Sequence, residues 1–547
     1  MLTQLPPELI LSVFSFLDLP CVRTLYLVCN SWKNFIDENE STIYHTLAAY
    51  HEYIRSTTVD FSQLPSMYSP KSLAGVTSWK SFCAQRVHIS KSWAGKASSH
   101  YVSYASSGST VHRIKVDEQA GIIMTSSRDG GLLVSDLTDD RVLWSLQKTY
   151  VRQCAHLEYG KGFLIFDSPE GNKEVWRLAS EFPSTGPSSN ALPDQVLASE
   201  EAFQEHAATY PKGHFKPWAV LKMPRVTHAF RFVYPTLLVG AWDHVFLWDI
   251  PSSELIQTIT PIQEPEDPNS AFAVVLANAP SFVARLGSLD NLNYVDVDEK
   301  HAFICGVTAL RVFSRATGKC ILDVPSTRRE YGSRRFSVIY ESEMSTDGAV
   351  LVNHYTDGKE LDLSRSSFQP RSIDEFIAVH VSSCGRHLVA MLASSRVVII
   401  KNFQDGPSSL DNRMSSYNLG LCSSRSKYLA IHNDRVAVAN NNGIFIFSLS
   451  AAVEARIIPS ASPSGTLVIS RAPFFGYHLY LSNLTCLQLS DTGLYLNWDP
   501  FHLKICQENE AEPRRLEALF RASTSDQTIR YLRMPTGDVL IMLGEGM

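Results

Sequence analysis

The 547-residue chain lacks the features that define secreted, membrane-spanning or nucleic-acid-binding proteins. Its ten cysteines are scattered and form no CxxC pair, so their spacing supports neither a zinc knuckle nor a disulfide framework. No apolar run approaches the ~20 residues of a membrane helix, and the N-terminal segment lacks the basic residues of a signal peptide. The 49 Lys and Arg are outnumbered by 55 Asp and Glu, which argues against general nucleic-acid binding. We therefore expect a soluble cytoplasmic or nuclear protein, with no nucleic-acid partner and no membrane span.

Catalytic and metal-binding motifs are also missing. The sequence contains no HExxH, Walker A, GxGxxG or GxSxG motif. His51-Glu52 has no second His four residues later, so it lacks the ligands that a zinc site requires. We expect a non-catalytic protein that holds no metal and no cofactor.

The chain has two regions of different pattern. Hydrophobic residues make up 44% of it, which is enough for a buried core. Residues 1–100 show helical periodicity, and short strands recur beyond them. Pro20 ends the first helical stripe, because proline disfavours helix at the residue before it. The apolar residues at helical spacing are Leu9, Ile10, Val13, Phe14 and Leu17, then Val22, Leu25, Tyr26, Val28 and Cys29, then Trp32, Phe35 and Ile36.

This N-terminal segment carries more apolar surface than it can bury. Three short helices in about 45 residues cover little of one another, and domains of that size usually need staples or partners. Some of the apolar surface must therefore be covered either by the C-terminal region of the same chain or by another protein.

The same segment resembles an F-box. The resemblance extends in order and without gaps over residues 3–36, with Phe16 where many members have Tyr. It is carried by Leu5-Pro6-Pro7-Glu8-Leu9-Ile10, Val13-Phe14, Leu17-Asp18-Leu19, Leu25, Val28-Cys29 and Trp32.

F-boxes dock onto a Skp-type adaptor, which joins a cullin–RING ubiquitin ligase, so the resemblance implies these partners. It also implies which side chains form or support the adaptor interface: Leu5, Pro6, Leu9, Ile10, Phe14, Leu17, Leu25, Val28 and Trp32. Val13 and Cys29 are expected to face inward instead. The resemblance thus favours a foreign protein as the cover for the apolar surface.

Residues 41–100 are expected to form a helical linker between the F-box of residues 1–40 and the strands. Trp79-Lys80, Arg86 and Trp93 resemble the linker of F-box/WD-repeat proteins. A helical linker fixes the distance between its two ends, which a Gly/Ser tether does not.

Residues 101–547 have the pattern of WD repeats. Residues 236–249 have the pattern of a strand, an Asp-centred turn, a second strand and a closing Trp248-Asp249, the only closing position that holds the full signature dipeptide. Most other closing positions hold Ser, Lys or Arg, so we expect propeller blades without a regular WD hydrogen-bond lattice. The closing positions are Asp136, Arg177, Asp249, Ser314, Lys401, Ser448, Ser490 and Arg533.

These positions recur at a spacing near the WD period of ~40–45 residues. We predict a WD-repeat-like β-propeller of seven or eight blades, with eight slightly favoured and another all-β arrangement as the alternative. A Pro- and Ser-rich stretch predicts a mobile insertion near residues 180–212. The predicted fold class is therefore α + all-β multidomain.

Four arginines in residues 325–337 form a candidate substrate site. Arg328, Arg329, Arg334 and Arg335 surround a single acid in a chain of net charge -6. Guanidinium groups bind phosphate and carboxylate in a bidentate manner, so a phosphorylated or acidic protein substrate is one hypothesis. The simpler alternative is a solvated basic loop that pairs with neighbouring acids.

These observations predict the substrate-recognition subunit of an SCF-type (Skp adaptor–cullin–F-box) ubiquitin ligase, which recruits proteins through its propeller. A scaffold that binds the adaptor without a cullin is the first alternative. A propeller enzyme whose N-terminal helices merely pack against it is the second.

Overall fold

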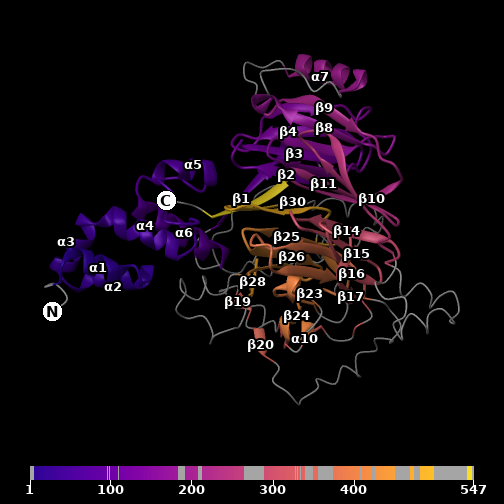
Figure 1. Cartoon of the computed structure of the whole chain (residues 1–547). Helices are drawn as coiled ribbons and strands as arrows, with labels where there is room; N and C mark the ends of the chain where they lie inside the picture. The colour runs from indigo at the N-terminus through magenta and orange to yellow at the C-terminus, as the bar shows by residue number, and fades with distance from the viewer. Residues whose placement is uncertain are drawn as a thin grey trace, which may run out of the picture.

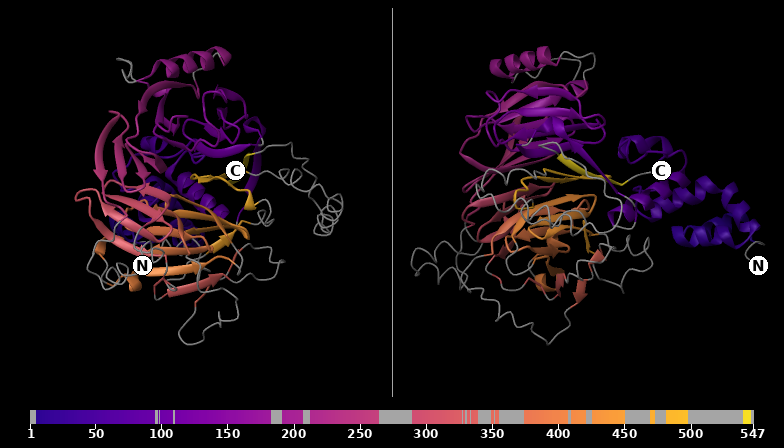
Figure 2. Two further views of the ribbon diagram at one scale, coloured as in Figure 1. Left: turned by 90° about the vertical axis from the view of Figure 1, so that its right-hand side faces the viewer. Right: turned by 180° about the vertical axis from the view of Figure 1, so that it is seen from behind.

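The computed structural model consists of N-terminal helices followed by a ring of β-sheets (Figure 1). The helices lie to one side of the ring in Figure 1 and behind it in the left view of Figure 2. The predicted order of helical region and β-propeller is therefore confirmed. The structure describes residues 5–94, 97, 99–108, 110–182, 191–206, 212–263, 289–326, 328, 331–332, 334–338, 349–350, 352–354, 374–406, 409–420, 425–449, 469–472, 481–497 and 539–544.

The helices begin where the sequence supplies suitable first residues. Pro7 opens the first helix, where a missing N–H costs no hydrogen bond. The Asp18 side chain caps the second helix by accepting from the backbone N–H of Cys21 at 2.8 Å. The helices of this region are α1 (Pro7–Phe14), α2 (Leu19–Val28), α3 (Asn30–Glu38), α4 (Glu40–Tyr50), α5 (Leu64–Met67) and α6 (Trp79–Trp93).

The second and third strands of most blades are buried along most of their length, and the strands of a blade pair in order along the chain. The ones in the first half of the ring are β1 (Ser99–Tyr104), β2 (Val111–Asp117), β3 (Ile122–Ser127), β4 (Leu132–Asp136), β5 (Val142–Leu146), β6 (Leu157–Gly160), β7 (Phe163–Asp167), β8 (Lys173–Leu178), β9 (Phe215–Leu221), β10 (Thr227–Val233), β11 (Thr236–Ala241), β12 (Val245–Asp249) and β13 (Glu254–Ile259).

The second half of the ring contains shorter additional strands. They are β14 (Leu292–Val297), β15 (His301–Gly306), β16 (Ala309–Ser314), β17 (Cys320–Pro325), β18 (Arg334–Val338), β19 (Ala349–Val350), β20 (Val352–His354), β21 (Phe376–Val381), β22 (Leu388–Leu392), β23 (Arg396–Ile400), β24 (Met414–Asn418), β25 (Ser426–His432), β26 (Arg435–Asn440), β27 (Gly443–Ser448), β28 (Ile469–Arg471), β29 (Leu487–Leu489), β30 (Gly493–Asn497) and β31 (Val539–Gly544).

The number of blades differs from the prediction of seven or eight. Six blades are each built on four consecutive strands, namely β2–β5, β6–β9, β10–β13, β14–β17, β21–β24 and β25–β28. One further sheet closes the ring by joining the two ends of the chain, in the order β1-β31-β30-β29. Strands β18 and β20 extend the β21–β24 blade at its outer edge, and β19 extends the next one.

The closing positions explain why the sequence overcounted. Asp249 ends β12 and Ser448 ends β27, each the third strand of a blade. Ser490, in contrast, follows β29, which is the strand of its sheet that lies beside β2 and β25 at the axis. Arg533 lies outside the described residues. A closing residue read from sequence alone does not reveal which strand of a blade it ends.

Closure of the ring depends on antiparallel pairing between strands from opposite ends of the chain. β1 pairs with β31 from Ser99 opposite Gly544 to Tyr104 opposite Val539. β31 pairs in turn with β30, from Gly493 opposite Leu543 to Asn497 opposite Val539. The first strands of successive sheets lie side by side around the axis.

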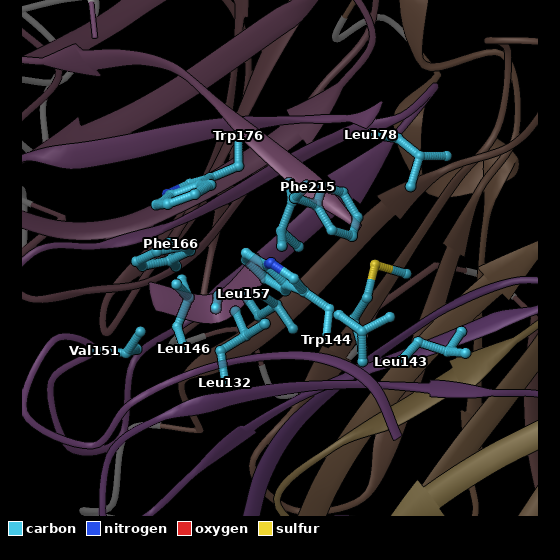
Figure 3. Close-up of a cluster of buried hydrophobic side chains, with 14 of the residues drawn as sticks. Leu132, Leu143, Trp144, Leu146, Val151, Leu157, Phe166, Trp176, Leu178 and Phe215 are labelled. Carbon is cyan, nitrogen blue, oxygen red and sulfur yellow. The ribbon is translucent and has the colours of Figure 1, made fainter. Parts of the chain in front are cut away.

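Aromatic side chains fill the space between neighbouring blades. Trp144 on β5 lies with its ring centroid 5.5 Å from that of Trp176 on β8 and 5.4 Å from that of Phe215 on β9 (Figure 3). These three side chains are buried, together with leucines from both blades. Apolar packing between sheets therefore replaces the regular WD lattice that the sequence lacks.

The predicted insertion near residues 180–212 contains a helix. α7 (Pro193–Glu205) lies between β8 and β9 and contacts β5 and β9 at the rim of the propeller (Figure 1). Pro193 lies in the first turn of α7, where proline favours the start of a helix, although the sequence predicted a mobile insertion here. Residues 183–190 and 207–211 of the insertion lie outside the described residues.

We expect Trp144→Ala to destabilise the propeller by about 3–5 kcal/mol, because a buried Trp leaves a cavity on truncation. The measurement is the shift of the thermal unfolding midpoint. Trp242→Ala is the matched control, since Trp242 is 49% exposed whereas Trp144 is 1% exposed. Equal shifts for the two variants would contradict the packing described for this cluster.

Candidate functional site

The N-terminal helices expose a set of large apolar side chains. Leu9, Val13 and Phe16 recur at the spacing of one helical face and are 53%, 44% and 78% exposed. Leu27 and Val28 at the end of α2 are 75% and 63% exposed. We call these five side chains, together with Leu5, the apolar face. It corresponds to the apolar surface that, by its sequence, this segment cannot bury by itself.

The predicted adaptor-binding residues divide into three groups by burial. Leu5, Pro6, Leu9 and Val28 are exposed. Leu17, Leu25 and Trp32 are partly buried. Ile10 and Phe14 are buried, and the Phe14 ring centroid lies 5.8 Å from those of Trp32 and of Phe35. Those two side chains support the surface from within.

Two expectations about orientation were wrong. Val13 and Cys29 were expected to face inward, yet both are exposed. Phe16 and Leu27 are the most exposed apolar side chains of the segment and were not assigned to the interface. The helical spacing of Leu9, Val13 and Phe16 was the signal that could have placed Val13 and Phe16 beside Leu9.

The helical linker shares its hydrophobic core with the first helices. One cluster of buried side chains contains Ile10 and Phe14 of α1, Leu47 of α4 and Phe82 of α6. At its edge the Lys80 ammonium contacts Glu40 at 3.0 Å and Asp37 at 3.7 Å. The first helices and the linker therefore form one packed unit.

A buried ion pair fastens this unit to the propeller. Arg86 of α6 donates through Nη1 and Nη2 to the carboxylate of Asp491, and the Nη2–Oδ1 distance is 2.9 Å. The Ser72 hydroxyl donates to the same carboxylate. Burial alone would raise the pKa of Asp491, but the Arg86 guanidinium outweighs it, so the pKa of this carboxyl lies well below its usual range.

Further polar contacts surround the ion pair. Trp93 Nε1 donates to the Asp491 carbonyl oxygen at 3.0 Å. On the propeller, the Glu118 carboxylate accepts from Ser69 of the linker at 3.0 Å and from Tyr495 at 2.8 Å. Glu118 follows β2 and Asp491 follows β29, so the linker sits where these first strands end.

A cavity lies at the other end of the propeller axis. Its volume is about 780 Å³, and its lining includes the opening residues of β2, β10, β14, β21 and β25. Because one cavity touches the beginnings of these strands, they run in the same direction. The seven residues of β2 separate it from Glu118 by about 20 Å at 3.3 Å per residue. We call it the axial cavity.

Positive charge predominates in the axial cavity. Five Lys and Arg side chains line it against two carboxylates, Asp167 and Glu170. Within the described ranges no hydrogen bond or ion pair joins Arg152, Arg225 or Lys427 to another residue. Arg152 and Arg225 come from connections between blades, and Lys427 lies at the start of β25.

Below the cavity, charges on the first strands neutralise one another. Glu158 lies 2.9 Å from Lys115 Nζ and 3.2 Å from Arg231 Nη1. Asp296 lies 3.4 Å from Arg231 Nε. Burial alone would raise the pKa of Glu158, but Lys115 and Arg231 outweigh it and hold the pKa well below its usual range. Among the described residues named here, the charges on the first strands are paired, whereas Arg152, Arg225 and Lys427 at the mouth are not.

The four arginines proposed from sequence are not brought together by any described contact. Arg328 donates through Nη2 to Asp411 at 2.9 Å, so this residue follows the simpler alternative of pairing with a neighbouring acid. Arg334 and Arg335 belong to β18, which pairs in parallel with β24. Their side chains, and the whole of Arg329, lie outside the described residues.

Comparison with known proteins agrees with this architecture. A family model for F-box-like domains matches residues 2–48. The chain therefore carries an F-box-like domain in this segment, and a β-propeller follows it. No curated protein sequence matches it.

Solved structures with a similar fold share little sequence with the chain. The WD40 repeats of RRP9 are 9% identical, with 81% of this chain and 97% of that chain covered and a TM-score of 0.44. U3-55K is 9% identical, with 81% and 98% covered and a TM-score of 0.42. The β-propeller domain of Cps50 (Swd1) from Myceliophteria thermophila is 9% identical, with 80% and 96% covered and a TM-score of 0.43.

The described residues include neither a membrane-spanning helix nor a cluster of metal-binding side chains. None of their helices combines the length and the apolar character of a membrane span. In the same part of the chain, no three His, Cys, Asp or Glu side chains gather in a way that could hold a metal ion.

We expect Asp491→Asn to weaken docking of the linker by about 3–5 kcal/mol, because it leaves the buried Arg86 charge without its partner. Faster amide hydrogen exchange in α6 and faster limited proteolysis after Trp93 would report the loss. The pKa of Asp491 is lowered in the folded state, so its contribution is present above about pH 4 and is lost as the pH falls further.

The difference between wild type and Asp491→Asn should therefore shrink as the pH falls below about 4. Asp129→Asn is the matched control, because the side chain of Asp129 is 55% exposed and lies 3.9 Å from Lys148. An unchanged exchange rate in α6 for Asp491→Asn at pH 7 would contradict the proposed anchor.

Proposed function

We propose that this protein is the substrate-recognition subunit of an SCF-type ubiquitin ligase, active in the cytoplasm or nucleus. The observation that carries the proposal is the apolar face. It lies on an F-box-like domain, and the described part of the chain does not cover it. Burial of a fully exposed Leu or Phe contributes about 1.5–3 kcal/mol. Covering the six partly exposed side chains of the apolar face supplies several kcal/mol for binding a Skp-type adaptor.

The arrangement of the two ends supports a role in presenting cargo. The shared core of α1 to α6 and the Arg86–Asp491 pair fix the apolar face relative to the propeller. The axial cavity opens at the far end of the strands that carry the linker contacts. A rigid receptor raises the effective concentration of its cargo near the conjugating enzyme, so its contribution to catalysis is proximity.

The axial cavity favours an anionic cargo segment. Arg152, Arg225 and Lys427 are cations without a described partner, and guanidinium groups pair with phosphate or carboxylate. We therefore propose that a phosphorylated or acidic segment of a protein substrate enters this cavity. The cluster of Arg328, Arg329, Arg334 and Arg335 remains the alternative site.

Two other functions make different predictions. A non-degradative scaffold would bind the adaptor through the same apolar face but would not recruit a cullin. A propeller enzyme would turn over a substrate without the N-terminal helices. Co-purification of a cullin with the full chain therefore separates the ligase subunit from the scaffold.

We expect Leu9→Asp combined with Leu27→Asp to weaken binding to a purified Skp-type adaptor by about tenfold or more, since loss of an interface anchor costs more than 1 kcal/mol. Surface plasmon resonance on the full chain measures the affinity. Val226→Asp is the matched control, because Val226 is 84% exposed at the opposite end of the propeller. Unchanged adaptor affinity in the double variant would remove the ligase and scaffold proposals together.

We expect Arg152→Glu combined with Arg225→Glu to abolish binding to phosphoserine peptides on an array, because reversed charges repel phosphate. Arg141→Glu combined with Lys319→Glu is the matched control, since both cations lie outside the axial cavity. Loss of binding in Arg334→Glu with Arg335→Glu, and not in the first pair, would assign recognition to the alternative site.

A further inference from the structure

Helix α7 packs on the propeller through one narrow face with three buried residues. Gln195, Ala198 and Ala202 are its buried residues, spaced by three and four positions along one face. Leu197 and Phe203 are 56% and 60% exposed, although both are large and apolar. The helix stands at the rim of the propeller (Figure 1). Leu197 and Phe203 line different clefts beside it.

A groove of about 460 Å³ runs along one side of α7. Asp194, Leu197, Glu201 and Glu205 form its helical wall, because residues three and four apart share one face of a helix. The connection between β5 and β6 and the turn between β7 and β8 form the opposite wall. We call this the α7 groove.

The α7 groove is lined by negative charge alone. Among the described residues that line it there are five carboxylates and no Lys, Arg or His; the five are Glu170, Glu174, Asp194, Glu201 and Glu205. Like charges in one groove raise each other's energy, and an incoming cation relieves this repulsion. The charge is opposite in sign to that of the axial cavity.

One of these carboxylates is buried and has no cation against it among the described residues. Glu174 is 5% exposed and accepts hydrogen bonds from Tyr150 Oη at 2.6 Å, Trp176 Nε1 at 3.1 Å and Gln195 Nε2 at 3.3 Å. All three donors are neutral, and burial raises the pKa of Glu174. Buried carboxylates are normally paired with a cation, so this one can gain from a positive partner.

We propose that the α7 groove docks a basic amphipathic segment of a partner protein. Its Lys or Arg side chains lie among the carboxylates, and its apolar side chains contact Leu197 and Leu192. Charge selects this occupant over the others: a second copy of the chain has a net charge of -6, and an anionic lipid surface would be repelled by the same carboxylates. The proposal does not depend on the adaptor or on the axial cavity.

The test uses the full chain and two labelled 14-residue amphipathic helical peptides, one of Lys and Leu and one of Glu and Leu, in fluorescence anisotropy. The Lys/Leu peptide is expected to bind and to lose affinity with salt, whereas the Glu/Leu peptide is not. Glu201→Lys should weaken the Lys/Leu peptide about fivefold or more, because it places a like charge in the groove.

The chain offers adjacent control positions on the same helix. Glu200 and Val196 line a separate cleft, on the other side of α7. Glu200→Lys should therefore change the affinity less than about twofold, although its charge change equals that of Glu201→Lys. Leu197→Ser should weaken peptide binding more than Val196→Ser. Because neither substitution changes a charge, this difference measures the apolar contribution to affinity.

Several outcomes would overturn the proposal. Equal binding of the two peptides would show that charge does not select the occupant. Equal effects of Glu200→Lys and Glu201→Lys would reduce the interaction to general attraction by an acidic helix. All four substituted side chains are solvent-accessible, and circular dichroism confirms that each variant is folded, so a loss of binding is read as a loss of the groove.

Discussion

The Arg86–Asp491 ion pair joins the helical unit to the propeller, and the position of the apolar face relative to the propeller depends on it. The guanidinium and the carboxylate are both removed from water, so each needs the other to avoid an unpaired buried charge. Ser72 and Trp93 bind the same aspartate through its carboxylate and its backbone carbonyl. A contact made of directional hydrogen bonds sets an orientation, which apolar packing alone fixes less strictly.

Closure of the ring imposes a second constraint. β1 immediately follows the linker, and β31 comes from the opposite end of the chain, so their pairing completes the propeller beside the point where the helices attach. Glu118 and Asp491, which bind the linker, follow strands that meet at this junction. Attachment of the helices and closure of the propeller therefore occur at one place in the molecule.

The surfaces available to partners differ in physical character. The apolar face on α1 and α2 is suited to a partner that buries it, the axial cavity carries unpaired cations, and the α7 groove carries only carboxylates. A chain with a net charge of -6 would not by itself suggest a cationic cavity. Paired charges such as Glu158 with Lys115 occupy the interior, which leaves the unpaired ones at the mouths of the cavities.

The sequence by itself determined the helical N-terminus, the F-box resemblance of residues 3–36 and the propeller, because each produces a periodic pattern of apolar residues or a motif within a short segment. It identified Leu9 and Val28 as surface residues but misplaced Val13, and it counted Ser490 as the end of a blade. Only the tertiary structure decided the pairing of Arg86 with Asp491, the cations that meet in the axial cavity and the acidic wall of α7. These sites join residues far apart in the chain, and the distance between such residues is set by the closure of the ring, which no local pattern encodes.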